Sequence, residues 1–417
     1  MNRIMLVACL ALLAGACGSD RGSAPLTVAV PETDLPDPVS APDREAENTP
    51  DTFQSGIQNW QGMSWDQNAY ATVAGYDVFS YQAARLMDDS QAGALVDELR
   101  ERQPDIIVGG YMEAHSVKEW EIAAYMDGRD SFAADWAEHA MANLAWTTEA
   151  DTFRPFDRTY MIDITADGAV EGMVEIIGSR WRASSNDRPN MFLMLDYCTV
   201  PHIGWLSGRW AAETHGELDL DQDGIAHLDD PDEQEDLRAA YYRLVDLLHA
   251  ELPGVKLISN GALALTDPVF LAKLDGIYIE GGFRWGWGRD YFREALVSDG
   301  PANLQAMLDA MQPGGFSIYE WKEDYRVGYA IGMFYDNLVP LMTPGADNIP
   351  FLVEPQPGEW DVGEALGPTV IEGDRMTREF EHGTAVLNIL AGNSPGAFEF
   401  TLTRSDGSVF INFIQAD

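Results

Sequence analysis

The chain has 417 residues, of which 46% are hydrophobic and 23% charged, so it is long enough and apolar enough to bury a large core. It carries 68 Asp and Glu against 26 Lys and Arg, a formal net charge of -42. A surface this acidic repels phosphates, which excludes a nucleic-acid-binding protein, and it gains no charge attraction to anionic lipid.

The first seventeen residues have the parts of an export signal. Arg3 supplies positive charge, residues 4–13 form an apolar run too short to span a bilayer, and small residues precede Cys17. Together they resemble a bacterial lipoprotein signal peptide, which implies cleavage after residue 16 and lipidation of Cys17. We therefore expect an exported protein, anchored in the cell envelope on its periplasmic or surface face. The alternative is an ordinary secretory signal cleaved near Ala16.

Residues 17–55 are predicted to form an extended acidic tether. Between residues 23 and 52 the chain has six prolines among Asp, Glu, Ser and Thr, with few large apolar side chains. Such a segment cannot bury enough apolar surface to offset the entropy lost on ordering. We expect it to hold the body of the protein away from a membrane.

From about residue 70, short apolar runs alternate with helical stretches, which is typical of an α/β protein with a parallel sheet. Eight such runs predict a (β/α)8 TIM barrel over residues 56–350. The runs are residues 76–81, 106–111, 160–164, 191–197, 255–259, 276–280, 316–321 and 338–342. Helices are expected at residues 90–102, 168–181, 232–252, 267–274 and 301–311. A doubly wound open sheet is the alternative fold, although no glycine-rich phosphate loop follows the first run.

After about residue 350 the pattern changes. Residues 384–390, 397–403 and 408–414 are β-segments by composition, separated by Gly and Asn turns. We therefore predict a small antiparallel β-domain over residues 351–417.

Two carboxylates close apolar strands of the predicted barrel, Asp196 after residues 191–195 and Glu280 after residues 276–279. The carboxyl ends of barrel strands build the active site, and a carboxylate buried there is costly unless it is paired. Two such groups can divide the roles of acid and base or nucleophile, as glycoside hydrolysis requires. The alternative is that each caps a helix or pairs with an Arg. Glu320 is a third candidate.

Several segments together resemble a known family: the Asp196 strand end, Asn260-Gly261, residues 275–280, residues 366–368 and residues 378–388. They are similar to glycoside hydrolases of the hypothetical glycosyl hydrolase type, barrel proteins related to the endo-α-1,4-polygalactosaminidases. The resemblance runs from about residue 70 to the end, through short motifs. It implies a catalytic pair at Asp196 and Glu280. We expect catalysis to require no cofactor.

Aromatic density after the strands favours a carbohydrate substrate, because pyranose rings pack their apolar faces on indoles. Residues 283–289 are too rich in glycine for a helix and unusually aromatic for a loop. The alternative is that these tryptophans pack the barrel rim. The side chains expected to contact sugar are Tyr111, Asn260, Tyr278, Trp285, Trp287 and Trp321.

A short acidic segment predicts a structural Ca²⁺ site. Asp219, Asp221 and Asp223 hold the first, third and fifth places, Gly224 holds the sixth, and Asp230 stands at the twelfth, where an EF-hand has a bidentate Glu. A solvated acidic turn is the alternative.

The sequence thus predicts an exported, lipid-anchored glycoside hydrolase, a monomer acting on a poly- or oligosaccharide. One alternative is a carbohydrate-binding surface lipoprotein whose barrel does not catalyse. Another is a transport or envelope-scaffold component.

Overall fold

The structure is a computed structural model, and the predicted signal peptide and tether lie outside the residues it describes. Those residues all belong to the unit Glu47–Asp417. Among them, no helix has both the length and the apolar character needed to cross a membrane. The described residues are 56–58, 73–88, 92–155, 158–184, 188–196, 198, 217–260, 267–279, 301–321, 325–342, 360, 362–390 and 398–415.

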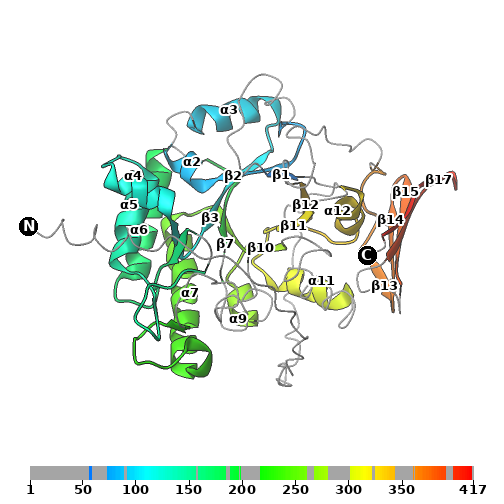
Figure 1. Ribbon diagram of the computed structural model, residues 1–417. Helices are drawn as coiled ribbons and strands as arrows, with labels where there is room; N and C mark the ends of the chain where they lie inside the picture. The colour runs from blue at the N-terminus through cyan, green and yellow to red at the C-terminus, as the bar shows by residue number, and fades with distance from the viewer. Residues whose placement is uncertain are drawn as a thin grey trace, which may run out of the picture. The chain divides into compact units, whose positions relative to one another are not determined.

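Eight parallel strands of the described chain form a closed barrel (Figure 1). The order around the barrel follows the sequence, and the last strand returns to pair with the first. The prediction of an eight-stranded parallel barrel is therefore confirmed. The strands are β1 Gly56–Gln58, β2 Val78–Gln82, β3 Ile107–Glu113, β7 Met191–Asp196, β9 Val255–Asn260, β10 Gly276–Ile279, β11 Ser317–Trp321 and β12 Leu338–Met342.

Helices connect the strands and cover the outside of the barrel (Figure 1). The longest, α7, begins after Asp230, whose side chain accepts hydrogen bonds from two main-chain N–H groups, and has Pro231 at its first position. Its buried residues Leu237, Tyr241, Leu244 and Leu248 recur at helical spacing. The connecting helices are α2 Ala83–Asp88, α3 Ala92–Arg102, α6 Ala169–Ala183, α7 Pro231–Glu251, α9 Pro268–Leu271, α11 Pro301–Ala310 and α12 Tyr325–Gly332.

The connection from β3 to β7 is long and contains additional elements. They are β4 Ser116–Lys118, α4 Glu119–Met126, α5 Phe132–Ala142, β5 Trp146–Thr147 and β6 Thr159–Met161. The prediction that residues 160–164 form a barrel strand is wrong, because β6 pairs antiparallel with β4 in a separate two-stranded sheet. An apolar run does not reveal which partner it will pair with.

The first place in the barrel belongs instead to β1, which the sequence pattern did not reveal. A strand of three residues is too short to show a periodic pattern. Because one strand was missed and one wrongly added, the strands β7 to β12 still occupy the fourth to eighth positions that the sequence predicts for them.

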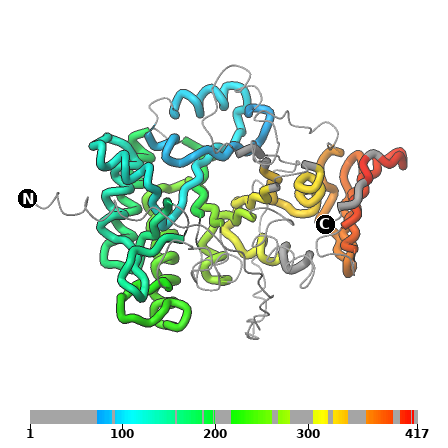
Figure 2. Tube along the Cα trace, in the orientation of Figure 1, coloured from blue at the N-terminus to red at the C-terminus, as the bar shows by residue number. Residues whose placement is uncertain are grey.

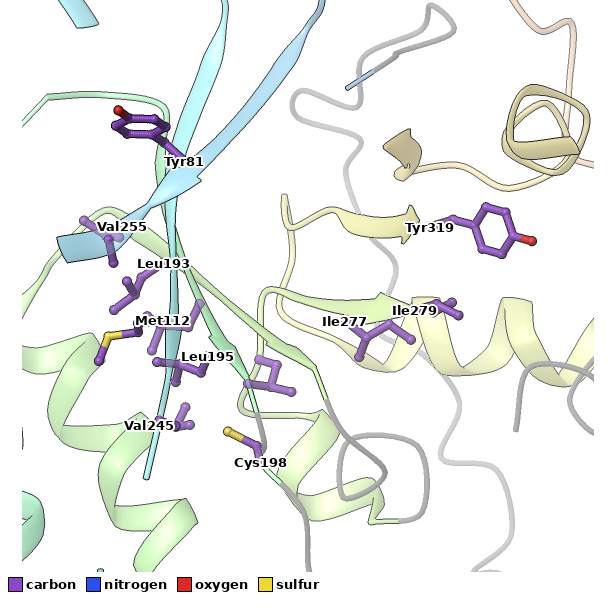
Figure 3. Close-up of a cluster of buried hydrophobic side chains, with 14 of the residues drawn as sticks. Tyr81, Met112, Leu193, Leu195, Cys198, Val245, Val255, Ile277, Ile279 and Tyr319 are labelled. Atoms are coloured by element: carbon purple, nitrogen blue, oxygen red, sulfur yellow. The ribbon is translucent and has the colours of Figure 1, made fainter. Parts of the chain in front are cut away.

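Side chains on the barrel strands alternate between the interior and the surrounding helices. Phe192, Met194 and Tyr278 belong to the cluster that fills the interior. On β3, a Cβ atom at Gly109 would lie 2.3 Å from the Phe192 ring, so only glycine leaves room for that side chain. The intervening residues face the helices, as Figure 3 shows for Leu193, Leu195, Ile277 and Ile279.

The chain ends in a five-stranded antiparallel sheet, which confirms the predicted C-terminal β-structure (Figure 2). Two of its strands precede the three that the sequence indicates. One face of the sheet is buried, through alternate residues such as Met376, Leu387, Phe400 and Leu402. The strands are β13 Val370–Glu372, β14 Arg375–Phe380, β15 Gly383–Ile389, β16 Phe398–Arg404 and β17 Val409–Gln415.

Aromatic and charged contacts join this sheet to the last helix of the barrel. The Trp360 ring lies 5.5 Å, centroid to centroid, from both Tyr329 of α12 and Phe400 of β16. Arg378 is nearly buried, donates to the main-chain carbonyl of Met333 at 3.2 Å and pairs with Asp336. The predicted domain boundary at residue 350 itself lies outside the described residues.

Candidate active site

The carboxyl ends of three neighbouring strands bring polar side chains together at one mouth of the barrel. Asp196 ends β7 and is 3% exposed, and its register partner on β3 is Glu113. Asn260 ends β9 and pairs in register with Tyr278 of β10. Met194 and Tyr278 face the interior of the barrel. Asp196 stands two residues after Met194, and Asn260 is the register partner of Tyr278, so both side chains also face inward.

The Asp196 carboxylate receives hydrogen bonds on both oxygens. The Tyr111 hydroxyl donates to Oδ2, and the Asn260 side-chain amide donates to Oδ1 at 2.8 Å. Donors to both oxygens favour the ionised form and offset the cost of burying a charge. Asp196 is therefore held as an oriented carboxylate, which suits a nucleophile or a general base better than an acid.

A second carboxylate, Glu113, lies beside Asp196 in an ion pair with Lys118. The Ser116 hydroxyl also donates to Glu113. Burial lowers the pKa of Lys118, but the charges of Glu113, Glu121 and Asp196 outweigh it and raise that pKa above its usual value. Lys118 is therefore a permanent cation at the barrel mouth.

Glu113, Ser116 and Lys118 line a pocket of about 60 Å³ together with Tyr111, the residue that donates to Asp196. Its wall includes the indole of Trp120, which is 54% exposed although tryptophan is usually buried. The volume holds a few water molecules or one substituent of a larger ligand. The polar and aromatic side chains that line it include Gln82, Tyr111, Glu113, Lys118, Trp120 and Glu121.

Cys198, two residues after Asp196, is buried and takes no part as a nucleophile. Burial first, and then the charge of Asp196, raise the pKa of the Cys198 thiol to about 12. A thiol with that pKa stays protonated at neutral pH and is unreactive.

The predicted sugar-contacting residues lie in different surroundings, and their contact with sugar stays a prediction. Tyr111 and Asn260 contact Asp196 and hold it in position. Tyr278 is 3% exposed within the barrel interior. Glu320 is fully buried on β11, and the adjacent Tyr319 belongs to the outer cluster, as alternation predicts (Figure 3). Glu280, Trp285 and Trp287, and the side chain of Trp321, lie outside the described residues.

The sequence did not point to Glu113 and Lys118. The predicted strand stopped at residue 111, whereas β3 continues to Glu113. An acidic residue two positions after an inward-facing Tyr111 was the available signal, since alternation gives both residues the same side. The pairing with Lys118 depends on the turn into β4, which no local pattern predicts.

The predicted Ca²⁺ ligands come together only in part. Carboxylate oxygens of Asp219, Asp221 and Asp223 lie within 4.8 Å of one another. Asp230 is not part of this group, because its carboxylate caps α7 by accepting from the main-chain N–H groups of Asp232 and Glu233.

No protein-family model and no curated protein matches the sequence. Among solved structures, the glycoside hydrolase domain of PelA from Pseudomonas aeruginosa is similar with a TM-score of 0.44 and 15% identity, over 72% of this chain and 98% of that one. Cyclic alpha-maltosyl-(1→6)-maltose hydrolase from Arthrobacter globiformis gives 0.42 and 10%, over 84% and 89% of the two chains. The GH36 alpha-galactosidase AgaB from Geobacillus stearothermophilus gives 0.42 and 9%, over 87% and 55%. Matches this distant do not establish a shared activity.

Glu121 provides a test of the electrostatics around the pocket. It accepts a hydrogen bond from the main-chain N–H of Lys118 at 2.7 Å. Burial, and secondarily the charge of Glu113, raise the pKa of Glu121 from 4.5 to about 8. The folded chain therefore keeps the Glu121 proton over a pH range in which the unfolded chain has released it.

We predict that the free energy of unfolding falls as pH rises from about 4.5 to about 8, because the unfolded state then binds fewer protons than the folded state. This group contributes a slope of at most about 1.4 kcal/mol per pH unit. Glu121→Gln keeps the hydrogen-bond acceptor and should remove that contribution, whereas the exposed control Glu119→Gln should not. Urea denaturation between pH 5 and 8 measures the slopes. Identical slopes for Glu121→Gln and the unmodified protein would contradict the prediction.

Proposed function

We propose that the chain is a glycoside hydrolase that cleaves a poly- or oligosaccharide, with Asp196 as nucleophile or general base and Glu280 as general acid. The observation that supports it most is Asp196 itself, buried at the barrel mouth with a donor on each carboxylate oxygen. Such a carboxylate can attack an anomeric carbon or take a proton from an attacking water. A second carboxyl group must then protonate the leaving oxygen.

The choice of Glu280 as the acid is supported by sequence position and by elimination. Glu280 follows β10 directly and stands two positions after the interior residue Tyr278. Glu113 is less suited to reach a substrate oxygen, because Lys118 contacts one of its carboxylate oxygens and Ser116 donates to the other.

In the proposed reaction, the Glu280 proton passes to the glycosidic oxygen as the bond to the anomeric carbon breaks. Either Asp196 forms the new bond to that carbon, and water, giving its proton to the deprotonated Glu280, then displaces Asp196 and releases the sugar; or water attacks the carbon directly while Asp196 takes its proton. The first course retains the anomeric configuration and requires carboxyl groups about 5 Å apart, whereas the second inverts it and requires about 6.5 to 9.5 Å.

This assignment predicts that Asp196→Asn and Glu280→Gln each lower the hydrolytic rate at least about a hundredfold without unfolding the protein. Reducing ends released from a panel of poly- and oligosaccharides identify a substrate and measure the rate. Circular dichroism and Tm check the fold. The controls are Asp246→Asn, an exposed partner of Lys273, and Glu98→Gln, a half-buried surface partner of Arg102, which should change the rate less than twofold.

Tyr111→Phe tests the role of Asp196 more closely. Losing one donor to the carboxylate should shift the acidic limb of the kcat/KM pH profile upward by about one pH unit. A uniform loss at every pH would mean that Tyr111 has a purely structural role.

Unchanged turnover in Asp196→Asn or Glu280→Gln would contradict the proposal. Glycan binding by the unmodified protein without released reducing ends would favour the carbohydrate-binding alternative.

The pocket lined by Tyr111, Glu113 and Lys118 is the proposed place of substrate contact. Its exposed Trp120 offers a flat apolar face to a pyranose ring, and the Lys118 ammonium group can donate to a hydroxyl group. A ring resting on Trp120 would direct one substituent into the pocket. The proposal therefore assigns Trp120 to binding and gives it no part in bond cleavage.

Trp120→Ala should accordingly raise KM about tenfold and change kcat less than threefold, because a stacking contact is worth roughly 1–2 kcal/mol. Met126→Ala is the matched control, since Met126 lies on the same helix and is 63% exposed. Steady-state kinetics on the substrate found by the panel provides both constants. A KM in Trp120→Ala equal to that of Met126→Ala would remove Trp120 from the site.

Export and lipid anchoring remain part of the proposal on the basis of the first seventeen residues alone. If Cys17 carries the lipid, Cys17→Ser should move the protein from the membrane fraction to the soluble fraction of the producing bacterium. Fractionation followed by mass spectrometry of the N-terminal peptide is the measurement. An unchanged membrane share in Cys17→Ser would exclude this anchor.

A further inference from the structure

The acidic loop between β8, Leu218–Asp219, and α7 gathers three carboxylates around one point. Oxygens of Asp219, Asp221 and Asp223 lie within 4.8 Å of one another. Two of these side chains also shape the turn, because Asp221 accepts from the main-chain N–H of Asp223 at 3.1 Å and Asp223 from that of Ile225 at 2.7 Å. Three negative charges this close repel one another unless a cation lies between them.

Asp219 differs from its two exposed neighbours in a way that points to a ligand. It is only 2% exposed, and its Oδ2 accepts from the main-chain N–H of Gly224 at 3.0 Å. Its Oδ1 is buried and has no hydrogen-bond partner among the described residues. Leaving a buried carboxylate oxygen unsatisfied is costly, and such atoms are rare in folded proteins. A cation bound within the loop would satisfy it.

A fourth carboxylate, that of Glu233 on α7, stabilises the main chain of the loop. Glu233 is 5% exposed, and its Oε1 accepts from the main-chain N–H groups of Leu220 and Asp221. Its Oε2 lies 2.9 Å from Nδ1 of His227. Since both oxygens of Glu233 are engaged, this side chain holds the loop in shape and leaves ligation to the three aspartates.

We propose that Asp219, Asp221 and Asp223 bind one Ca²⁺ ion, with Asp219 Oδ1 as the buried ligand. Three carboxylates and no sulfur or imidazole ligand suit a hard cation. Ca²⁺ takes about six to eight oxygen ligands, so water and main-chain carbonyl groups of the loop would complete its shell. This site differs from an EF-hand at its twelfth place, since Asp230 caps α7.

The ion would tie the end of β8 to the turn that leads into α7. Asp219 pairs in register with Trp146 of β5, and the loop leads into the N-terminus of α7. Binding to the folded chain alone raises the free energy of unfolding by mass action. The site is therefore structural, and its existence does not depend on the proposed hydrolase activity.

Titration calorimetry with CaCl2 on the EDTA-treated protein tests the site. We expect one ion per chain with a Kd between about 10⁻⁵ and 10⁻³ M and a higher Tm in Ca²⁺. Asp219→Asn and Asp223→Asn should each weaken binding at least about tenfold. Asp230→Asn is the matched control, because Asn is an equally good helix cap and should leave Kd within about twofold.

Terbium gives a second readout that does not depend on stability. Tb³⁺ replaces Ca²⁺ in oxygen sites, and Trp146, the register partner of Asp219, lies close enough to sensitise its emission. Trp146→Phe should lose the emission while keeping Ca²⁺ affinity. No heat of binding and no sensitised emission at 10 mM ion would overturn the proposal. A loss in Asp230→Asn as large as in Asp219→Asn would overturn the ligand assignment.

Discussion

The hydrogen bonds that Tyr111 and Asn260 donate to Asp196 are the contacts on which the barrel mouth depends. They join β3, β7 and β9 at the point where the apolar interior ends. An ionised carboxylate in such a place is stable only with donors on its oxygens. The donors are available because the parallel register sets Tyr111 beside Met194 and brings the ends of β7 and β9 together. A slip of one residue would turn Asp196 toward the helices.

The same alternation explains how much of the fold the sequence could predict. Strands buried on both faces read as apolar runs, so β3, β7 and β9 to β12 were found within a few residues of their ends. With three residues, β1 is too short to show an alternating hydrophobic pattern. Its position in the barrel is evident only from its pairing with β12 and β2. Residues 160–164 have a barrel-like pattern, but residues 159–161 form β6, which pairs with β4 and not with a barrel strand. A local sequence pattern indicates that a segment forms a strand, whereas tertiary contacts decide which sheet the strand joins.

The sequence could predict those site residues whose position depends on one strand alone, but not the contacts between strands. Asp196 was found because a carboxylate at the end of an apolar strand needs a partner. Its actual partners, Tyr111 and Asn260, were expected to contact sugar, since a sequence does not reveal which side chain reaches across the barrel. Lys118 was missed because its contact with Glu113 depends on the turn into β4.

Buried carboxylates in this acidic chain are compensated in different ways, and the difference separates their roles. Glu233 receives main-chain N–H groups on one oxygen and His227 on the other, which suits a structural support. Asp196 receives donors from side chains, and one of them, Tyr111, also lines the pocket at the barrel mouth. Asp219 has one compensated oxygen and one without a partner in the described structure. An unsatisfied buried oxygen lowers the stability of the folded state. Asp219 therefore destabilises the fold unless a bound cation contacts its unpaired Oδ1. The same reasoning that favours chemistry at Asp196 thus favours an ion at Asp219.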